Sequence, residues 1–176
     1  MEKVQIKTER LLLRPLGTED LEAFYAYASD VENTRYMIYF PHCDREQTRE
    51  FLEAVEAEWE KESPSFYEFS ILADGVQIGT ASVYPEGGEG CGELAWMLHK
   101  AYWHHGYATE AATAVRDFAF ASLGLKKLYA HCDCRNLASA CVMERLGMVR
   151  ECEQERVYSD ERGAAREYRY FLPRQQ

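Results

Sequence analysis

The sequence predicts an α/β protein built on one mixed, mostly antiparallel sheet with helices on both faces. Two observations predict it: a three-stranded meander occupies the middle of the chain, and a strand–helix–strand crossover follows it. A meander needs antiparallel neighbours and a crossover needs parallel ones, so the sheet must be mixed. The chain has 176 residues, 47% of them hydrophobic, which corresponds to a single domain, 1–176, with one core.

The first elements are a strand and two helices. The segment RLLLRPL, residues 10–16, predicts a strand that ends at Pro15. Thr18 is the expected N-cap of a helix, because apolar residues with helical spacing follow it. A second helix begins after Asp44 and carries a run of glutamates between residues 46 and 62, which is expected to face solvent.

The middle of the chain predicts the meander. Residues 66–73 and 76–84 have strand patterns and are joined by Asp74 and Gly75, a pair favoured in two-residue hairpin turns. A third strand follows at 91–99. These three strands should therefore be antiparallel neighbours in the sheet.

The last third of the chain alternates between helix and strand. A helix is expected over about 106–123, a strand over 126–134 and a short helix over 136–147. Two closing strands, 148–158 and 165–172, then form a hairpin. The strand at 126–134 follows a crossover helix, so it should lie parallel to the last strand of the meander.

Composition narrows the range of partners. The formal net charge is −10 and the isoelectric point is near 5.0, which argues against a nucleic-acid partner, since such proteins neutralise phosphates with Lys and Arg. An acidic surface instead suits a cationic partner such as an amine. No apolar run approaches the roughly 18 residues of a membrane span, so no membrane partner is expected.

Cellular location and metal binding are inferred from absences. The amino-terminal segment is charged and lacks a secretory apolar run, so we expect a cytoplasmic protein with its six cysteines reduced. Four residues suggest a thiolate metal site at first sight: His131, Cys132, Cys134 and Cys141. They lack a second pair at zinc spacing, so no metal is expected.

The segment WHHGYAT, residues 103–109, connects the third meander strand to a helix. A helix N-terminus carries unpaired N–H groups and a partial positive charge. Gly106 would allow the bend and Ala108 a close approach, so the amides of 104–109 could hold a phosphate. A glycine here is also ordinary turn chemistry. The sequence lacks the glycine patterns of dinucleotide and nucleoside-triphosphate loops, so neither ligand is predicted.

Three motifs give this segment a context: GYATEA at 106–111, N-x-x-S at 136–139 and ERLGM at 144–148. Together with the opening TERLLLRPL they resemble the GNAT superfamily of acyl-CoA-dependent N-acetyltransferases. Within it they resemble the branch of the ribosomal-protein alanine N-acetyltransferases, over nearly the whole chain. The resemblance implies a splayed sheet with acetyl-CoA, as cosubstrate, between the strands at 91–99 and 127–134.

The resemblance also implies how the coenzyme is held. Backbone groups of Met97 and Leu98 would pair with the pantetheine arm, and a bulge there would supply N–H donors to the carbonyl oxygen. Asn136 would be an N-cap, a coenzyme ligand, or both. The pyrophosphate would be held by the residues His104, His105, Gly106, Tyr107, Ala108 and Thr109.

One departure from the family concerns charge. Many family loops have Gly-Arg or Gly-Lys where this chain has His104 and His105. Because histidine is mostly neutral above about pH 6.5, we hypothesise that His105 makes coenzyme binding weaken as the pH rises. The alternative is that both histidines are exposed substitutions without consequence.

Acetyl transfer needs a base for the ammonium group and an acid for the leaving thiolate. The N-x-x-S match nominates Ser139 as the acid, although a small polar residue also suits a helix turn. Glu93 is the first choice for the base, because a carboxylate in an apolar strand is costly unless it is used or paired. The alternatives are a structural Glu93 at the strand edge that reaches solvent or an arginine, and deprotonation through ordered water.

The acceptor site should involve the loops 32–44 and 157–168. Tyr36, Tyr39 and Phe40 are candidate walls of an acceptor groove, with a simple core role as the alternative. The predicted enzyme transfers an acetyl group from acetyl-CoA to a primary amine, either a protein N-terminus or a small cationic amine. The alternative is a non-catalytic acyl-CoA-binding regulatory module. Monomers and homodimers both occur in the family.

Overall fold

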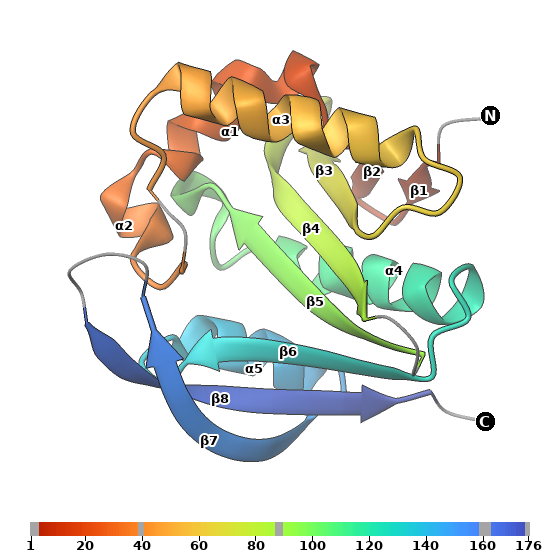
Figure 1. The fold of residues 1–176 in the computed structure, drawn as a ribbon, viewed down its shortest axis with the longest axis vertical. Helices are drawn as coiled ribbons and strands as arrows, with labels where there is room; N and C mark the ends of the chain where they lie inside the picture. Colours follow the sequence, from red (N-terminus) through yellow and green to blue (C-terminus); the bar gives the residue numbers. More distant parts are fainter. Residues whose placement is uncertain (1–3, 39–40, 87–89, 159–162, 175–176) are drawn as a thin grey trace.

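One eight-stranded sheet organises the protein, with strand order β1-β2-β3-β4-β5-β6-β8-β7 (Figure 1). The computed structural model describes residues 4–38, 41–86, 90–158 and 163–174. Neighbouring strands are antiparallel except β5 and β6, which are parallel. The strands are β1 Ile6–Lys7, β2 Leu11–Pro15, β3 Tyr67–Ala73, β4 Val76–Glu86, β5 Cys91–Leu98, β6 Lys127–Asp133, β7 Val149–Val157 and β8 Ala164–Pro173.

Helices cover both faces of this sheet, so the predicted fold class is confirmed. The helices α1 and α3 lie together on one face, and α4 and α5 lie on the other (Figure 1). None of the described helices combines the length and the apolar character of a membrane span. The helices are α1 Leu21–Ala28, α2 Val31–Thr34, α3 Arg45–Trp59, α4 Tyr107–Ala121 and α5 Leu137–Arg145.

Strand β5 shows which side chains share a face. Successive side chains of a strand point to opposite faces of the sheet. Leu94 and Leu98 belong to the core under α4 and α5, whereas Met97 belongs to the core under α1 and α3. Glu93 has the same parity as Met97, so its side chain lies on the α1–α3 face.

Strands β5 and β6 are paired only at their beginnings. Three residue pairs join them: Cys91 with Lys127, Gly92 with Leu128 and Glu93 with Tyr129. Both strands continue, to Leu98 and to Asp133, but within these fully described strands no ladder pair joins 94–98 to 130–133. The sheet therefore opens in its middle while β4 and β8 hold the outer edges of the two diverging strands.

Three local expectations are corrected. Thr18 is not an N-cap: it begins a short 3-10 turn, Thr18–Asp20, and its hydroxyl donates a hydrogen bond to Glu56. The first strand pattern is preceded by the short strand β1, which pairs with β2. The glutamate run is not wholly solvated, because Glu58 is buried and accepts hydrogen bonds from Ser65 and Lys61.

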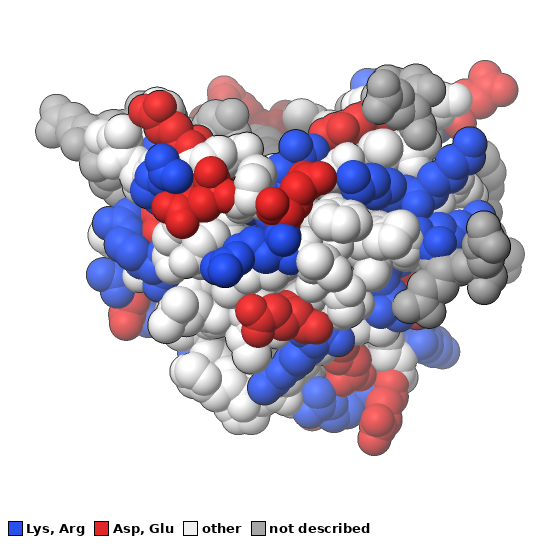
Figure 2. Space-filling model, turned by 90° about the horizontal axis from the view of Figure 1, so that it is seen from below, with Lys and Arg blue, Asp and Glu red and all other residues white. Residues whose placement is uncertain are grey.

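The surface over β7 and β8 mixes charges of both signs. Figure 2 shows acidic and basic side chains interspersed on this side of the molecule. Ion pairs account for part of the pattern: Arg166 lies 2.8 Å from Glu153, and Arg169 lies 3.3 Å from Glu151.

Candidate active site

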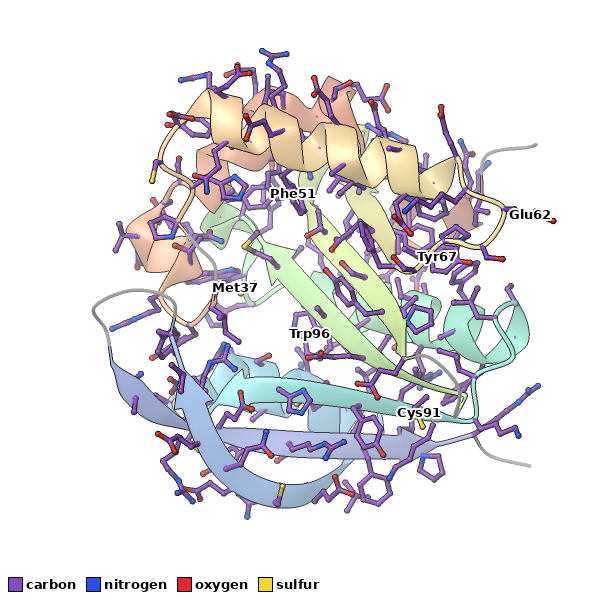
Figure 3. The ribbon with its side chains drawn as sticks, in the orientation of Figure 1. Met37, Phe51, Glu62, Tyr67, Cys91 and Trp96 are labelled. Carbon is purple, nitrogen blue, oxygen red and sulfur yellow. The ribbon has the colours of Figure 1, made fainter. Side chains whose placement is uncertain are left out.

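The opening between β5 and β6 exposes main-chain groups of β5. In the antiparallel pair β4–β5, the N–H of His99 bonds to the carbonyl of Ile78 at 2.9 Å. Hydrogen-bonded and non-hydrogen-bonded pairs alternate along an antiparallel ladder. Every second residue of β5 therefore directs its N–H and carbonyl toward β4, and the residues between them direct these groups toward the opening. The main-chain groups of Leu98 and Trp96 face the opening, and Trp96 is labelled at this part of β5 in Figure 3. The side chain of Trp96 packs against the core under α4 and α5.

This register corrects the expectation for Met97. Met97 is the partner of Thr80 in a hydrogen-bonded position, so its N–H and carbonyl are directed to β4 and not to the opening. The expected bulge at 97–98 is also absent, because the β4–β5 register runs unbroken from Cys91 to Leu98. Leu98 lies at the open edge, and its pairing with pantetheine stays a prediction.

The carbonyl of Leu98 is already bonded within the protein. It accepts hydrogen bonds from Asn33 Nδ2 at 2.9 Å and from Trp103 Nε1 at 3.0 Å. Asn33 also accepts a bond from the N–H of Lys100, so the segment after α1 is fastened to the end of β5. The N–H of Leu98 is therefore the group that this residue can offer to a ligand.

The turn before α4 has the geometry that its sequence predicts. Gly106 is the N-cap of α4 and has φ +81°, a left-handed conformation that favours glycine. His104 has φ +67°, which is uncommon for a residue with a side chain. Left-handed residues in such turns direct successive N–H groups to one side, as in anion-binding nests.

The amides of this turn are available. The first hydrogen bond of α4 runs from the N–H of Glu110 to the carbonyl of Gly106, at 3.1 Å. Among the described residues, none accepts a hydrogen bond from the N–H groups of Tyr107, Ala108 or Thr109. Together with the open edge of β5, they fit a ligand with a diphosphate and an extended amide-containing arm, which is the form of coenzyme A.

Arg10, the residue before β2, binds this turn through its guanidinium. Its Nη1 donates to the carbonyl of His105 at 2.9 Å, and its Nε donates to Glu110 Oε2 at 2.7 Å. The guanidinium also lies over the ring of Tyr107, 4.6 Å from its centroid. Burial would raise the pKa of Glu110, but hydrogen bonds from Thr8 and Arg10 bring it below its ordinary value. The guanidinium of Arg10 therefore places a positive charge beside the turn 103–109, which contains no Lys or Arg.

His105 lies against the same turn. Its Nδ1 is 2.7 Å from the carbonyl of Trp103, and its ring stacks on that of Tyr107. A carbonyl only accepts, so Nδ1 carries the proton of the neutral imidazole and Nε2 is left with the lone pair. The pH dependence of coenzyme binding through His105 stays a prediction, which a dissociation constant unchanged between pH 6 and 8 would contradict.

Ser139 and Asn136 lie at the beginning of α5. The side-chain Oδ1 of Asn136 accepts a hydrogen bond from the N–H of Ser139 at 3.1 Å, so Asn136 is the N-cap. In the described part of the chain, no residue accepts a hydrogen bond from its Nδ2 group, which could therefore donate to a ligand. Ser139 is half-buried on the α4–α5 side, whereas Glu93 lies on the α1–α3 face. The two predicted catalytic side chains thus approach the opening from opposite faces.

Glu93 has a partner that the sequence does not indicate. Its Oε1 lies 3.0 Å from Nδ1 of His131, the residue two places beyond Tyr129 on β6. The side chains are 40% and 21% exposed, respectively. The contact lies directly after the last β5–β6 pair, where the strands begin to part.

A second carboxyl lies deeper on the same face. Glu68 on β3 is buried and accepts hydrogen bonds from the hydroxyls of Ser82 and Tyr84. Burial raises the pKa of Glu68, and the two hydroxyl bonds only partly oppose it. Burial also raises the pKa of Tyr84, the register partner of Glu93. A continuous polar face therefore crosses β3, β4, β5 and β6.

The far end of this face is closed by ion pairs. Asp133 at the end of β6 is bonded to Arg135 and to the hydroxyl of Tyr158, at 2.7 and 2.5 Å. Arg156 bonds to the carbonyl of Tyr36 at 3.0 Å, which joins the closing hairpin to the segment after α2. The main chain of Tyr36 therefore lies beside Arg156, and a role for Tyr36 in an acceptor groove stays a prediction. Tyr39 and Phe40 lie outside the described residues.

Sequence reasoning missed Arg10 and the role of His131. The sequence suggests His131 only as a metal ligand. The signal for its contact with Glu93 is its spacing of two residues from Tyr129 on a predicted strand, which puts both side chains on one face of the sheet. Arg10 had no such signal, because its partner Glu110 is a hundred residues away in the chain. Among the described residues, no three His, Cys, Asp or Glu side chains are grouped as a metal site.

A mixed sheet that opens between two parallel strands, beside a helix that begins with free amides, is the architecture of the acyl-CoA-dependent N-acetyltransferases. The chain belongs to the GNAT acetyltransferase family, whose acetyltransferase domain model matches residues 10–149. Members of this family transfer an acetyl group from acetyl-CoA to an amine.

Individual relatives agree with this assignment. The chain is 32% identical over 151 residues to the uncharacterised N-acetyltransferase YnaD of Bacillus subtilis, with 84% of each chain covered. It matches the crystal structure of a GNAT-family acetyltransferase from Bacillus anthracis with a TM-score of 0.83 and 29% identity, over 97% of this chain and 98% of that one. It also shares its fold with a spermidine N-acetyltransferase from Vibrio cholerae in complex with CoA and spermine. That match has a TM-score of 0.81 and 17% identity, over 94% and 96% of the chains.

Proposed function

We propose that this protein transfers an acetyl group from acetyl-CoA to a primary amine by direct attack of the amine on the thioester. The observation that carries the proposal is the open edge of β5 beside the unpaired amides that begin α4. These two features together offer a strand partner for pantetheine and a receptor for a diphosphate.

The coenzyme contacts follow from the directions of the main-chain groups. Leu98, with Trp96, presents the open edge to the pantetheine arm, in place of Met97. The amides of 104–109 surround the pyrophosphate, and Arg10 holds the turn in that shape. Asn136 Nδ2 is placed to add a donor from α5.

The catalytic contacts surround the thioester on both sides of the sheet. Bound acetyl-CoA supplies an activated carbonyl carbon. Glu93 and its partner His131 receive the ammonium group of the acceptor, and the N–H of Leu98 stabilises negative charge on the carbonyl oxygen. Ser139 gives a proton to the leaving sulfur from the α5 side.

The acceptor is a cationic amine. The protein carries a net charge of −10, and the face that receives the acceptor contains the partly exposed carboxylate of Glu93. The amino terminus of a protein and a small polyamine both meet this description. The family's ribosomal-protein branch supports the first, and the Vibrio spermidine N-acetyltransferase supports the second.

An acceptor screen tests the proposal. Release of free thiol from acetyl-CoA is measured with N-terminal peptides, polyamines and aminoglycosides, and mass spectrometry identifies the acetylated product. Transfer to at least one amine above the rate of hydrolysis without acceptor is expected. Tight binding of coenzyme without transfer to any member of the panel would instead support the non-catalytic module.

A further inference from the structure

His131 is the titratable group on the acceptor face that the sequence left without a role. It lies on β6, two residues beyond Tyr129 and on the same face of the sheet, at the point where β5 and β6 diverge. Its Nδ1 is 3.0 Å from Glu93 Oε1, and 21% of its side chain remains exposed. The imidazole is thus fixed by a carboxylate and still reachable from the opening.

The contact determines which ring nitrogen can act. An ionised carboxylate only accepts hydrogen bonds, so in this pair the proton lies on Nδ1 of the neutral imidazole. The second nitrogen, Nε2, then holds the lone pair. A carboxylate in this position also stabilises the imidazolium that forms when Nε2 is protonated, as the aspartate does in hydrolase triads.

Several charged groups surround the imidazole. Glu93 on β5 and Asp133 on β6 favour its protonation, although Asp133 is itself paired with Arg135. Arg169 on β8, the register partner of His131, opposes it; this guanidinium lies 4.1 Å from the ring centroid of Tyr129. Tyr84 on β4 lies behind Glu93 and stays neutral, because burial raises its pKa.

We propose that Nε2 of His131 takes the proton from the acceptor ammonium, and that Glu93 is a positioning residue that holds the imidazole in the productive tautomer. The inference rests on the proposed function and names its base. It replaces the assignment of Glu93 as the base, because the contact with Glu93 leaves Nε2 of His131 with a lone pair, and histidine is the side chain that most often acts as a general base.

The proton and electron pairs balance as follows. Nε2 of His131 takes one proton from the ammonium group, which leaves a neutral amine and an imidazolium paired with Glu93. The amine lone pair forms the nitrogen–carbon bond, and the carbon–sulfur bond breaks with its electron pair on sulfur. The second proton leaves nitrogen and reaches sulfur through the hydroxyl of Ser139, and the imidazolium returns its proton to solvent.

The test uses the amine identified by the screen and compares His131→Gln with Glu93→Gln. At pH 7 we expect kcat/KM to fall by about 100-fold in His131→Gln. We expect a smaller loss, about tenfold, in Glu93→Gln, because the glutamine carbonyl still accepts from Nδ1. The coenzyme dissociation constant, measured by calorimetry, should stay within about twofold of the wild type in both variants, which shows that they fold.

Two further measurements separate chemistry from structure. Free imidazole should restore part of the activity of His131→Ala, and the residual rate of His131→Gln should keep rising with pH where the wild type levels off. Tyr129→Phe is the matched control, because Tyr129 lies two residues before His131 on the same face of β6. Its kcat/KM and pH profile should be those of the wild type. If His131→Gln does not bind coenzyme, His131→Asn takes its place.

The outcomes are distinct. A wild-type rate and pH profile in His131→Gln, or a larger loss in Glu93→Gln than in His131→Gln, overturns this inference and leaves the proposed function intact, because the wild type is active in the same assay. Absence of turnover by the wild type with every amine overturns the proposed function, and the inference fails with it.

Discussion

The turn before α4 and the polar face that crosses β3, β4, β5 and β6 lie around the same opening. The turn is built from main-chain groups and the polar face from side chains. The turn presents main-chain amides of the consecutive residues 104–109. The polar face presents side chains from four strands, among them Glu68, Glu93 and His131. A main-chain receptor suits the diphosphate that every coenzyme A ligand carries, whereas side chains suit an acceptor that differs from one enzyme to the next.

The comparison has a consequence for mutations. A side-chain substitution in the turn leaves the amides in place unless it changes the backbone, so coenzyme binding should be robust there. On the polar face the side chains are themselves the groups to which we assign the function. Substitutions on that face should therefore change the chemistry or the acceptor while coenzyme affinity is retained.

The largest effect that tests this division is expected at Ser139. It lies at the beginning of α5, on the coenzyme side, but its proposed role is chemical. Ser139→Ala should lower kcat by about 100-fold, because the leaving sulfur loses its proton donor. The dissociation constant of coenzyme, measured by calorimetry, should not change.

The control for Ser139 is Leu137→Ala, because Leu137 is exposed in the same turn of α5. It should leave both kcat and coenzyme affinity at wild-type values. A Ser139→Ala variant with normal kcat and weakened coenzyme binding would place Ser139 with the turn instead of with the chemistry.

An intermediate effect is expected at Asp133, which closes the acceptor face. Burial opposes its charge, but hydrogen bonds from Arg135 and Tyr158 hold the pKa of Asp133 well below its ordinary value. Asp133→Asn should lower the free energy of unfolding by about 2 kcal/mol at pH 7, the scale of hydrogen bonds to a charged group. Urea denaturation measures the change, and coenzyme affinity of the folded variant should persist.

The pH dependence of the Asp133 contribution has a definite sign. The pKa of this carboxyl is lower in the folded than in the unfolded chain, where it is near 3.9. Its stabilisation is therefore complete above about pH 5 and is lost as the pH falls below that value. Between pH 5 and 3 the wild type should lose more stability than Asp133→Asn, and parallel curves would contradict the assignment.

The smallest effect is expected at Arg10, the exception to the main-chain character of the turn. Arg10→Ala removes the bonds to the carbonyl of His105 and to Glu110. The dissociation constant of coenzyme A should rise about tenfold, equivalent to about 1.4 kcal/mol. That of pantetheine, which lacks the pyrophosphate, should stay the same.

Two arginine controls sharpen the comparison at Arg10. Arg10→Lys keeps the charge but not the two-pronged geometry, so its affinity should lie between those of the alanine variant and the wild type. Arg150→Ala, on the exposed strand β7, removes a charge far from the turn. Equal losses for coenzyme A and pantetheine in Arg10→Ala would show that the arginine supports the fold and not the diphosphate receptor.

Sequence predicted those features that depend on residues close together in the chain. Asp74 and Gly75 form the hairpin turn, both with positive φ, because that conformation is intrinsic to the pair. Gly106 begins α4 in the left-handed conformation for a similar local reason. The order of strands and helices follows from such local patterns, and the fold class follows from the order.

Sequence did not predict the features that depend on register between distant strands. The contact of Glu93 with His131 exists because Glu93 is aligned with Tyr129 across the parallel pair, and α4 separates the two strands in the chain. Met97 shows the same limit. The alternation of side chains along a strand predicts which face of the sheet each side chain lies on. Only the register shows whether the N–H and carbonyl groups of that residue point to one neighbouring strand or to the other.

A strand with free amides in the middle of a sheet is also a weakness in the unliganded protein. Unpaired strand edges attract other extended chains, and such contacts lead to aggregation. A ligand that occupies the edge of β5 binds the folded chain and not the unfolded one, so it raises the melting temperature in proportion to the logarithm of its concentration. We therefore predict that the melting temperature of this protein rises with the concentration of coenzyme A.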